Sequence, residues 1–158
     1  MDKDNNKNAL VIESPEFSQN GHIPLQYSCD GENINPPVNI SNVPEGTKTL
    51  ALIMEDPDAP NGTFTHWLLW NIYPNDKIAE KTSLGVTGIN SFGKTGYGGP
   101  CPPSGTHRYY FKAYALDREL TIVAGEDKNS LLEAMEGHIL ATGELVGRYS
   151  RKKVNSPL

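Results

Sequence analysis

Two carboxylates follow one of the most apolar segments of the sequence. Asp56 and Asp58 stand two residues apart in MEDPDAP, directly after TLALIM (49–54). Because Pro57 and Pro60 cannot donate hydrogen bonds to a sheet, the chain is expected to leave the sheet at this point. In extended chain, residues two apart project to the same side, so both carboxylates can face one site. The alternative is a turn in which each aspartate bonds its own backbone.

A histidine follows in FTHWLLWNI (64–72), whose aromatic and aliphatic residues predict an inner strand. Strict alternation groups Phe64, His66, Leu68 and Trp70 on one face of that strand. A histidine among such neighbours is expected to be partly buried and therefore to need a hydrogen-bond partner. On its own, such a histidine is more often structural than functional.

A second histidine opens another strand-like segment, HRYYFKAYAL (107–116). Alternation places His107 and Tyr109 on one face of this strand, while Arg108 points the other way. The preceding loop, GYGGPCPPSG (96–105), holds three prolines and four glycines in ten residues. Glycine lets backbone N–H groups approach a ligand closely, and the alternative is a tight structural crossover.

Together, these segments place two aspartates, two histidines and a tyrosine at the ends or inner faces of predicted strands. Polar side chains that converge in a cleft are what a small-ligand site requires. The pattern favours a non-catalytic site for an anionic, phosphate-like small molecule, with no metal and no other cofactor.

Two hydrolase alternatives stay open. Two histidines and two carboxylates suit a divalent metal that acts on a phosphoester, although no HExxH-type spacing is present. Ser104 and Cys101 lie near His107 in the sequence, yet PPSGT is not the G-x-S-x-G elbow of a nucleophilic serine. We therefore expect a binding protein rather than an enzyme.

Short apolar runs, broken by 12 prolines and 15 glycines, predict one mostly β domain over residues 1–158. The polar residues 1–8 indicate a flexible N-terminus, and residues 152–158 a C-terminal tail. The stretch 73–99 has little periodicity and is expected to be a long loop. Strands are expected at residues 9–12, 25–29, 38–40, 49–54, 64–72, 107–116, 120–123 and 144–149.

One helix is expected in the last third of the chain. Ser130 and Glu133 fit a capping box, in which the serine accepts a backbone N–H and the glutamate reaches back. Apolar residues then recur at helical spacing, namely Leu131, Leu132, Met135, Ile139 and Leu140.

Charge and hydropathy restrict the partners. A formal net charge of −5 argues against nucleic acid, and the basic residues near the C-terminus (148–153) are interpreted as solvated. No apolar run approaches the ~20 residues that span a bilayer, and no apolar segment of signal-peptide type follows the N-terminus. We expect a cytoplasmic protein without stable membrane insertion. Whether Cys29 and Cys101 form a disulfide stays open, since one would be unusual in a reducing compartment.

These motifs resemble the phosphatidylethanolamine-binding protein family, also called Raf kinase inhibitor-like, and in particular its bacterial and archaeal branch. The similarity covers most of the chain in family order, and DPDAP, HW and GPCPPSGTHRY form a specific signature. The similar segments are YSCDGENINPP (27–37), residues 43–72, residues 96–117 and GHILATGELVGRYSR (137–151).

The resemblance implies two packed antiparallel sheets with one or two short helices. It also implies a small pocket for phosphate or a phosphorylethanolamine-like head group. Carried over by position, the pocket residues are Asp56, Asp58, His66, Gly99, Pro100, His107 and Tyr109. Relatives further suggest a homodimer and a role as regulator or inhibitor of a kinase or serine protease, whose identity the sequence does not reveal.

Two aspartates in an anion site raise an electrostatic question, because like charges about 4 Å apart repel by roughly 4 kcal/mol at an effective dielectric near 20. The carboxylates can stand behind the histidines and keep them cationic. Alternatively, one carboxylate keeps a proton, or both face an ammonium group on the ligand. For inorganic phosphate we expect the first arrangement, with the strongest affinity in mildly acid solution.

Overall fold

The computed structural model describes residues 9–151, so the predicted flexible N-terminus (1–8) and C-terminal tail (152–158) lie outside the described residues. Within that range the fold is mostly β, with two antiparallel sheets, as predicted. A single α-helix, α2 (Lys128–Met135), and one 3-10 helix, η1 (Leu25–Tyr27), accompany the described strands. The strands are β1 (Val11–Glu13), β2 (Asn39–Ser41), β3 (Thr49–Asp56), β4 (Phe64–Ile72), β5 (Val86–Thr87), β6 (His107–Leu116) and β7 (Ile139–Tyr149).

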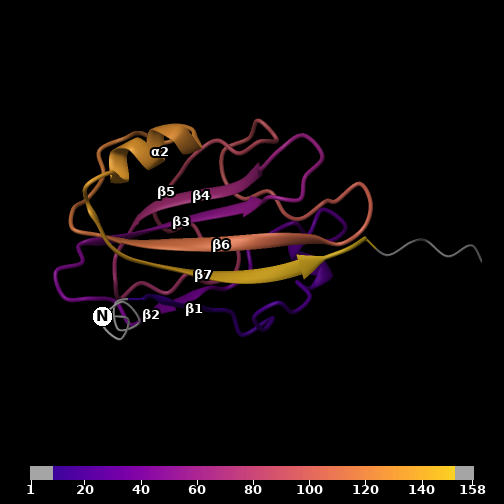
Figure 1. Cartoon of the computed structure of the whole chain (residues 1–158), viewed down its shortest axis with the longest axis horizontal. Coiled ribbons are helices and arrows are strands. Elements are labelled where there is room, and N and C mark those ends of the chain that lie inside the picture. The colour runs from indigo at the N-terminus through magenta and orange to yellow at the C-terminus, as the bar shows by residue number, and fades with distance from the viewer. Residues whose placement is uncertain (1–8, 152–158) are drawn as a thin grey trace, which may run out of the picture.

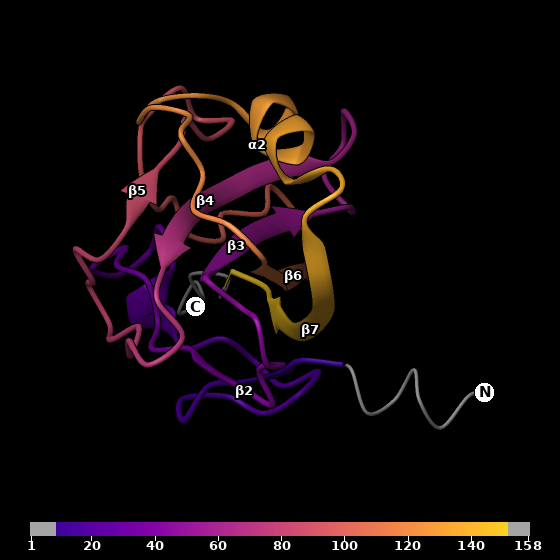
Figure 2. The same ribbon diagram turned by 90° about the vertical axis from the view of Figure 1, so that its left-hand side faces the viewer.

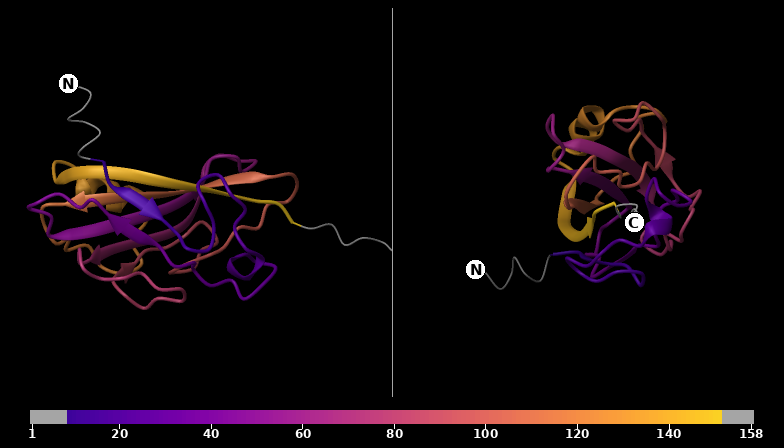
Figure 3. Two further views of the ribbon diagram at one scale, coloured as in Figure 1. Left: turned by 90° about the horizontal axis from the view of Figure 1, so that it is seen from below. Right: turned by 90° about the vertical axis from the view of Figure 1, so that its right-hand side faces the viewer.

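The larger sheet has the strand order β5-β4-β3-β6-β7, and the smaller one pairs β1 with β2 (Figure 1). Helix α2 lies over one face of the larger sheet, whereas β2 lies on the opposite side (Figure 2). The long edge strand β7 runs the length of the molecule beside β1 (Figure 3). Strand β3 is therefore central, and all eight of its residues are buried.

Each face of the larger sheet has its own apolar cluster. Leu52, Trp67 and Phe111 belong to the cluster between the two sheets. Ile53 and Leu68, their sequence neighbours, belong to the cluster under α2. Alternation along the central strands thus supplies both clusters, as expected for strands that are covered on both faces.

A β-bulge interrupts the alternation that the sequence predicts for β4. Met54 pairs with Trp67 and Glu55 pairs with Thr65, so His66 has no partner on β3. A bulge adds one residue to a strand and re-aims the side chains on either side of it. His66 consequently joins Trp67 on the inner face and separates from Leu68, contrary to the strict alternation expected.

The helix is shorter than predicted and begins earlier. Asp127 caps it, since its carboxylate accepts the backbone N–H of Ser130 at 2.9 Å, so Ser130 is not the cap. Gly137, with a φ of 82°, follows soon after the helix ends. A left-handed backbone of this kind terminates helices, which is why residues 139–140 enter β7 instead.

Two predicted strands are absent from the structure. Residues 25–29 contain η1, because the backbone N–H groups of Tyr27 and Ser28 donate to local carbonyls at 3.1 and 3.0 Å. Residues 120–123 are not a strand either. The side-chain amide of Asn71 bonds both the N–H and the C=O of Leu120, at 2.9 Å each, and so occupies the groups that a ladder would use.

Two neighbouring leucines of α2 test how the helix packs. Leu131 is fully buried, whereas Leu132 is 39% exposed. Leu131→Ala should lower the free energy of unfolding by about 2–5 kcal/mol, because it removes buried apolar contacts and leaves a cavity. Leu132→Ala, the matched control, should change it by less than about 0.5 kcal/mol. Equal effects in chemical denaturation would contradict the packing of α2 on the sheet.

Candidate functional site

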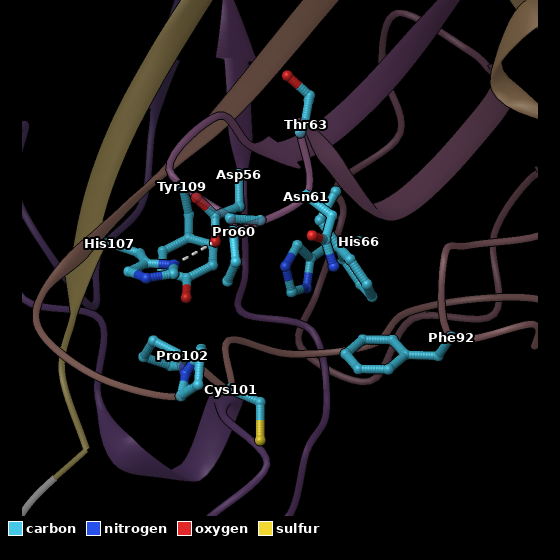
Figure 4. Close-up of a pocket in the computed structure, with 14 residues that line it drawn as sticks. Asp56, Pro60, Asn61, Thr63, His66, Phe92, Cys101, Pro102, His107 and Tyr109 are labelled. Atoms are coloured by element: carbon cyan, nitrogen blue, oxygen red, sulfur yellow. Dashed lines mark hydrogen bonds and ion pairs between the residues drawn. The ribbon is translucent and has the colours of Figure 1, made fainter.

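A cavity of about 270 Å³ opens at the end of the sheet where β3 finishes and β4 and β6 begin (Figure 4). Four of the predicted ligand-binding residues line it, namely Asp56, His66, His107 and Tyr109. The other three, Asp58, Gly99 and Pro100, lie outside the lining. The remaining lining residues are Ala59, Pro60, Asn61, Gly62, Thr63, Phe64, Phe92, Cys101, Pro102 and Pro103.

Asp56 orients His107 from behind. The Nδ1–H of His107 donates to Asp56 Oδ2 at 2.6 Å, and the two side chains are only 9% and 4% exposed. The other oxygen, Oδ1, accepts the backbone N–H of Asp58 at 2.7 Å. The two arrangements considered for Asp56 thus occur together: its carboxylate bonds the backbone of the turn, and the residue also lines the cavity. With Nδ1 engaged, Nε2 is the nitrogen of His107 that a ligand can reach.

His66 stands across the cavity from His107 (Figure 4). Its Nδ1 lies 2.7 Å from the carbonyl oxygen of Gly98, which can only accept a hydrogen bond. Nδ1 therefore carries the proton, and Nε2 has a free lone pair. Burial lowers the pKa of His66 below 6.5, although the carbonyl of Gly98 and the charge of Asp56 oppose this shift. Burial thus disfavours the cationic form of His66, which a carboxylate behind the ring was expected to favour.

Tyr109 supplies a buried hydroxyl between the two histidines (Figure 4). Its Oη has no hydrogen-bond partner among the described residues, although the backbone of Cys101 approaches it. Burial is the main reason that the pKa of Tyr109 is raised, so the phenol stays protonated and is a hydrogen-bond donor. A buried hydroxyl without a partner is rare and costly, and this one belongs to a residue that lines the cavity.

Asp58 turns away from the cavity and binds Arg108. Its carboxylate accepts two bonds from the guanidinium, at 2.9 and 2.8 Å, and one from the backbone N–H of Arg108, at 2.9 Å. Hydrogen bonds from Arg108 lower the pKa of Asp58 to about 2. The site therefore contains one carboxylate rather than two, and the repulsion expected between a pair of aspartates does not arise.

Gly99 and Pro100 hold the wall of the cavity in place from outside it. A side chain at residue 99 would approach the carbonyl oxygen of Tyr27 to 2.2 Å, so only glycine allows this close packing. The N–H of Gly99 donates to Asn33 at 2.8 Å, and the carbonyl of Pro100 accepts from Cys29 at 3.0 Å. The loop is thus a structural crossover whose packed side supports the site.

A disulfide between Cys29 and Cys101 completes this attachment and answers the question that the sequence left open. Cys101 lines the cavity, and Pro102 and Pro103 follow it in the wall. A disulfide is unusual in a reducing compartment, so it does not support the expected cytoplasmic location. No helix within residues 9–151 is long and apolar enough to cross a membrane.

Sequence reasoning missed the apolar part of the site. Phe64, Phe92 and the prolines 60, 102 and 103 line the cavity together with the predicted polar residues. These prolines stand in the DPDAP and CPP motifs, so their positions in the sequence could have indicated that they line the cavity. Phe92 gave none, because it lies in the long loop whose path depends on the fold.

The metal-dependent alternative finds no support in this geometry. Across residues 9–151, no group of three or more His, Cys, Asp or Glu side chains is placed to hold a metal ion. Cys101 is in the disulfide and so is not a free thiol.

Comparison with known proteins identifies the family. The family model described as phosphatidylethanolamine-binding protein matches residues 13–150. The chain belongs to this family. Membership implies a binding protein.

Relatives occur in archaea and bacteria. The UPF0098 protein of Archaeoglobus fulgidus is 51% identical over 92% of this chain, which spans about half of that relative's length (52%). The UPF0098 protein of Methanothermobacter thermautotrophicus is 46% identical, with 90% of this chain and 99% of that protein covered.

Two solved structures share the fold. One is described as a phosphatidylethanolamine-binding protein homologue from Chlamydia trachomatis. It is 46% identical with a TM-score of 0.88, and the match covers 92% of this chain and 99% of that one. The other is the E. coli family member YbcL, 31% identical with a TM-score of 0.83, covering 90% and 99%.

Removal of the disulfide tests its support of the cavity wall. Cys29→Ser/Cys101→Ser should lower the free energy of unfolding by about 2–4 kcal/mol, because the link closes a long loop. The backbone amides of residues 29 and 99, which bond across this attachment, should also exchange hydrogen faster in the double variant. Reduced wild-type protein should behave in the same way. Unchanged exchange in both would show that hydrogen bonds alone fix the loop.

Proposed function

We propose that this family member is a non-catalytic binding protein whose cavity holds the phosphate group of an anionic small molecule. The observation that carries the proposal is the hydroxyl of Tyr109, which is buried in the cavity wall and has no partner among the described residues. His66 and His107 offer their Nε2 atoms on opposite sides of the same cavity. An anion with several oxygens can contact all three groups at once.

The single carboxylate at the site supports this proposal. Both carboxylate oxygens of Asp56 already accept hydrogen bonds from the protein, one from His107 and one from the backbone of the turn. A carboxylate that orients an imidazole fixes which nitrogen faces the ligand. Asp56 therefore has a positioning role, and His107 makes the contact.

Proton balance favours a phosphate-type ligand over a carboxylate. In the free protein His66 is neutral at pH 7, because burial lowers its pKa, and its Nε2 can only accept a hydrogen bond. A phosphate monoanion has an acidic hydroxyl to donate to this nitrogen. A dianion instead requires that His66 take up a proton on binding. Phosphate monoesters change between these forms near pH 6, so either route is open close to neutrality.

The expected protein partner remains a prediction. The resemblance suggests a kinase or serine protease as a target and a homodimer as the assembly, and the described residues bear on neither. The ligand proposal stands independently of both.

Two adjacent tyrosines test the site. Tyr109→Phe removes the unpartnered hydroxyl and should weaken phosphate binding about 10- to 100-fold, the loss of one hydrogen bond to a charged group. Tyr110→Phe is the matched control, because Tyr110 lies on the opposite face of β6 and bonds Arg108. Calorimetric titration measures both. Since the hydroxyl of Tyr109 has no partner to lose, this variant should be as stable as wild type. Equal affinities in all three proteins would remove Tyr109 from the site.

Phosphate affinity should be highest in mildly acid solution and fall as pH rises. Above pH 7 both the imidazole of His66 and the ligand have lost the proton that their contact needs, so affinity should fall by up to about tenfold per pH unit. Titrations at pH 7.5 in buffers of different ionisation enthalpy should show proton uptake. Glutamine donates a hydrogen bond from its amide without first taking up a proton, so His66→Gln should reduce the proton uptake. Binding enthalpies independent of the buffer would contradict this mechanism.

A further inference from the structure

A phenylalanine stands exposed at the mouth of the cavity on a well-ordered turn. Phe92 is 45% exposed and lines the cavity. Asn90 organises the turn that carries it, because its side chain accepts the N–H groups of Phe92 and Lys94 and donates to the carbonyl of Gly96. The exposed ring is therefore held at the cavity, where a substituent on a bound ligand would meet it.

Three rings meet at this side of the cavity. Phe92 lies edge-on to Phe64, with ring centroids 4.7 Å apart, and edge-on to His66 at 5.5 Å. Gly98 permits the arrangement, since a Cβ there would lie 2.5 Å from the ring of Phe92. A further flat ring placed against the exposed part of Phe92 would extend this edge-to-face packing.

The cavity also has room beyond the phosphate contacts. Its 270 Å³ is several times the roughly 30 Å³ that one water occupies in the liquid. Proline rings at positions 60, 102 and 103 line it together with Phe64 and Phe92. The space next to the histidines is therefore apolar, and a substituent on the phosphate would lie against rings rather than charges.

An ammonium group would find no free carboxylate here. Asp56 already accepts from His107 and from the backbone, and Asp58 binds Arg108 outside the cavity. An amine buried in an apolar space without a counter-ion is unfavourable. The arrangement in which the aspartates face a ligand ammonium is thus disfavoured by their existing bonds.

We infer that the site selects phosphate monoesters that carry a flat aromatic group, with Phe92 as the residue that determines this preference. The inference rests on the proposed anion site and names the ligand class that fits it. The phosphate contacts His66, His107 and Tyr109, and the aromatic substituent packs against Phe92 and Phe64 at the mouth.

The test compares five ligands by calorimetry at pH 6.5: inorganic phosphate, methyl phosphate, phenyl phosphate, cyclohexyl phosphate and O-phosphorylethanolamine. Wild-type protein should bind phenyl phosphate roughly tenfold more tightly than methyl phosphate, from ring packing and buried apolar area. Phosphorylethanolamine should bind no better than methyl phosphate. Cyclohexyl phosphate, an apolar but non-planar analogue, should bind more weakly than phenyl phosphate.

Phe92→Ala should bring the affinity ratio of phenyl to methyl phosphate close to one. Ile89→Ala is the matched control, since Ile89 is 37% exposed near the same turn but does not line the cavity, and it should keep the wild-type ratio. Phe92→Leu retains an apolar side chain without a ring and should give an intermediate ratio. This variant also controls for the possibility that alanine disturbs the conformation of the loop.

The outcomes separate the two proposals. Binding of inorganic phosphate with no preference for phenyl phosphate would overturn the aromatic selectivity and leave the anion site intact. A preference that survives Phe92→Ala, or phosphorylethanolamine that binds as tightly as phenyl phosphate, would also overturn it. Failure of wild-type protein to bind any of the phosphates would overturn the anion site and the inference that rests on it.

Discussion

The β-bulge at His66 is the constraint on which the site depends. In a regular strand, Trp67 and Thr65 would face the same way, and the side chains of His66 and Phe64 would lie on the helix side of the sheet. The extra residue instead puts Phe64, His66 and Trp67 on the inner face, with Phe64 paired to Asp56. Trp67 can then fill the core between the sheets while its two predecessors reach the cavity. A polar contact and an aromatic one thus come from a single irregularity, at the strand end where bulges often serve function.

Charge is distributed so that an anion can enter a protein of net charge −5. Of the two aspartates beside the cavity, one is paired with a guanidinium on the outside, and the other is bonded to an imidazole and a backbone N–H. Both carboxylates are therefore hydrogen-bonded within the protein before a ligand arrives. The groups that remain to meet the proposed anion are the phenol of Tyr109 and the Nε2 atoms of His66 and His107, and their hydrogen bonds are strong because the surroundings are apolar. This arrangement explains why the electrostatic conflict expected from the sequence is absent.

The wall of the cavity is fixed by residues that never touch its interior. Gly99 packs on the backbone of Tyr27, and the phenol of Tyr97 donates to the carbonyl of the same residue at 2.6 Å. The disulfide adds a covalent link between the same two regions of the chain. Residues 27–33 therefore act as a platform for the loop, although none of them lines the cavity. Rigid support of this kind keeps a small site in a defined shape.

The central strands β3, β4 and β6 could be predicted from the sequence alone, because they are long apolar runs. The sequence also predicted Asp56, His66, His107 and Tyr109 as neighbours in one site, since each stands at a strand end or on a strand face within a specific motif, and all four line the cavity. It did not determine which way Asp58 turns, because that depends on Arg108, which lies 50 residues away. Nor did it reveal the bulge, the disulfide or the place of Phe92. Each of these arises where segments distant in the chain pack together, and only tertiary structure decides which partner a side chain meets.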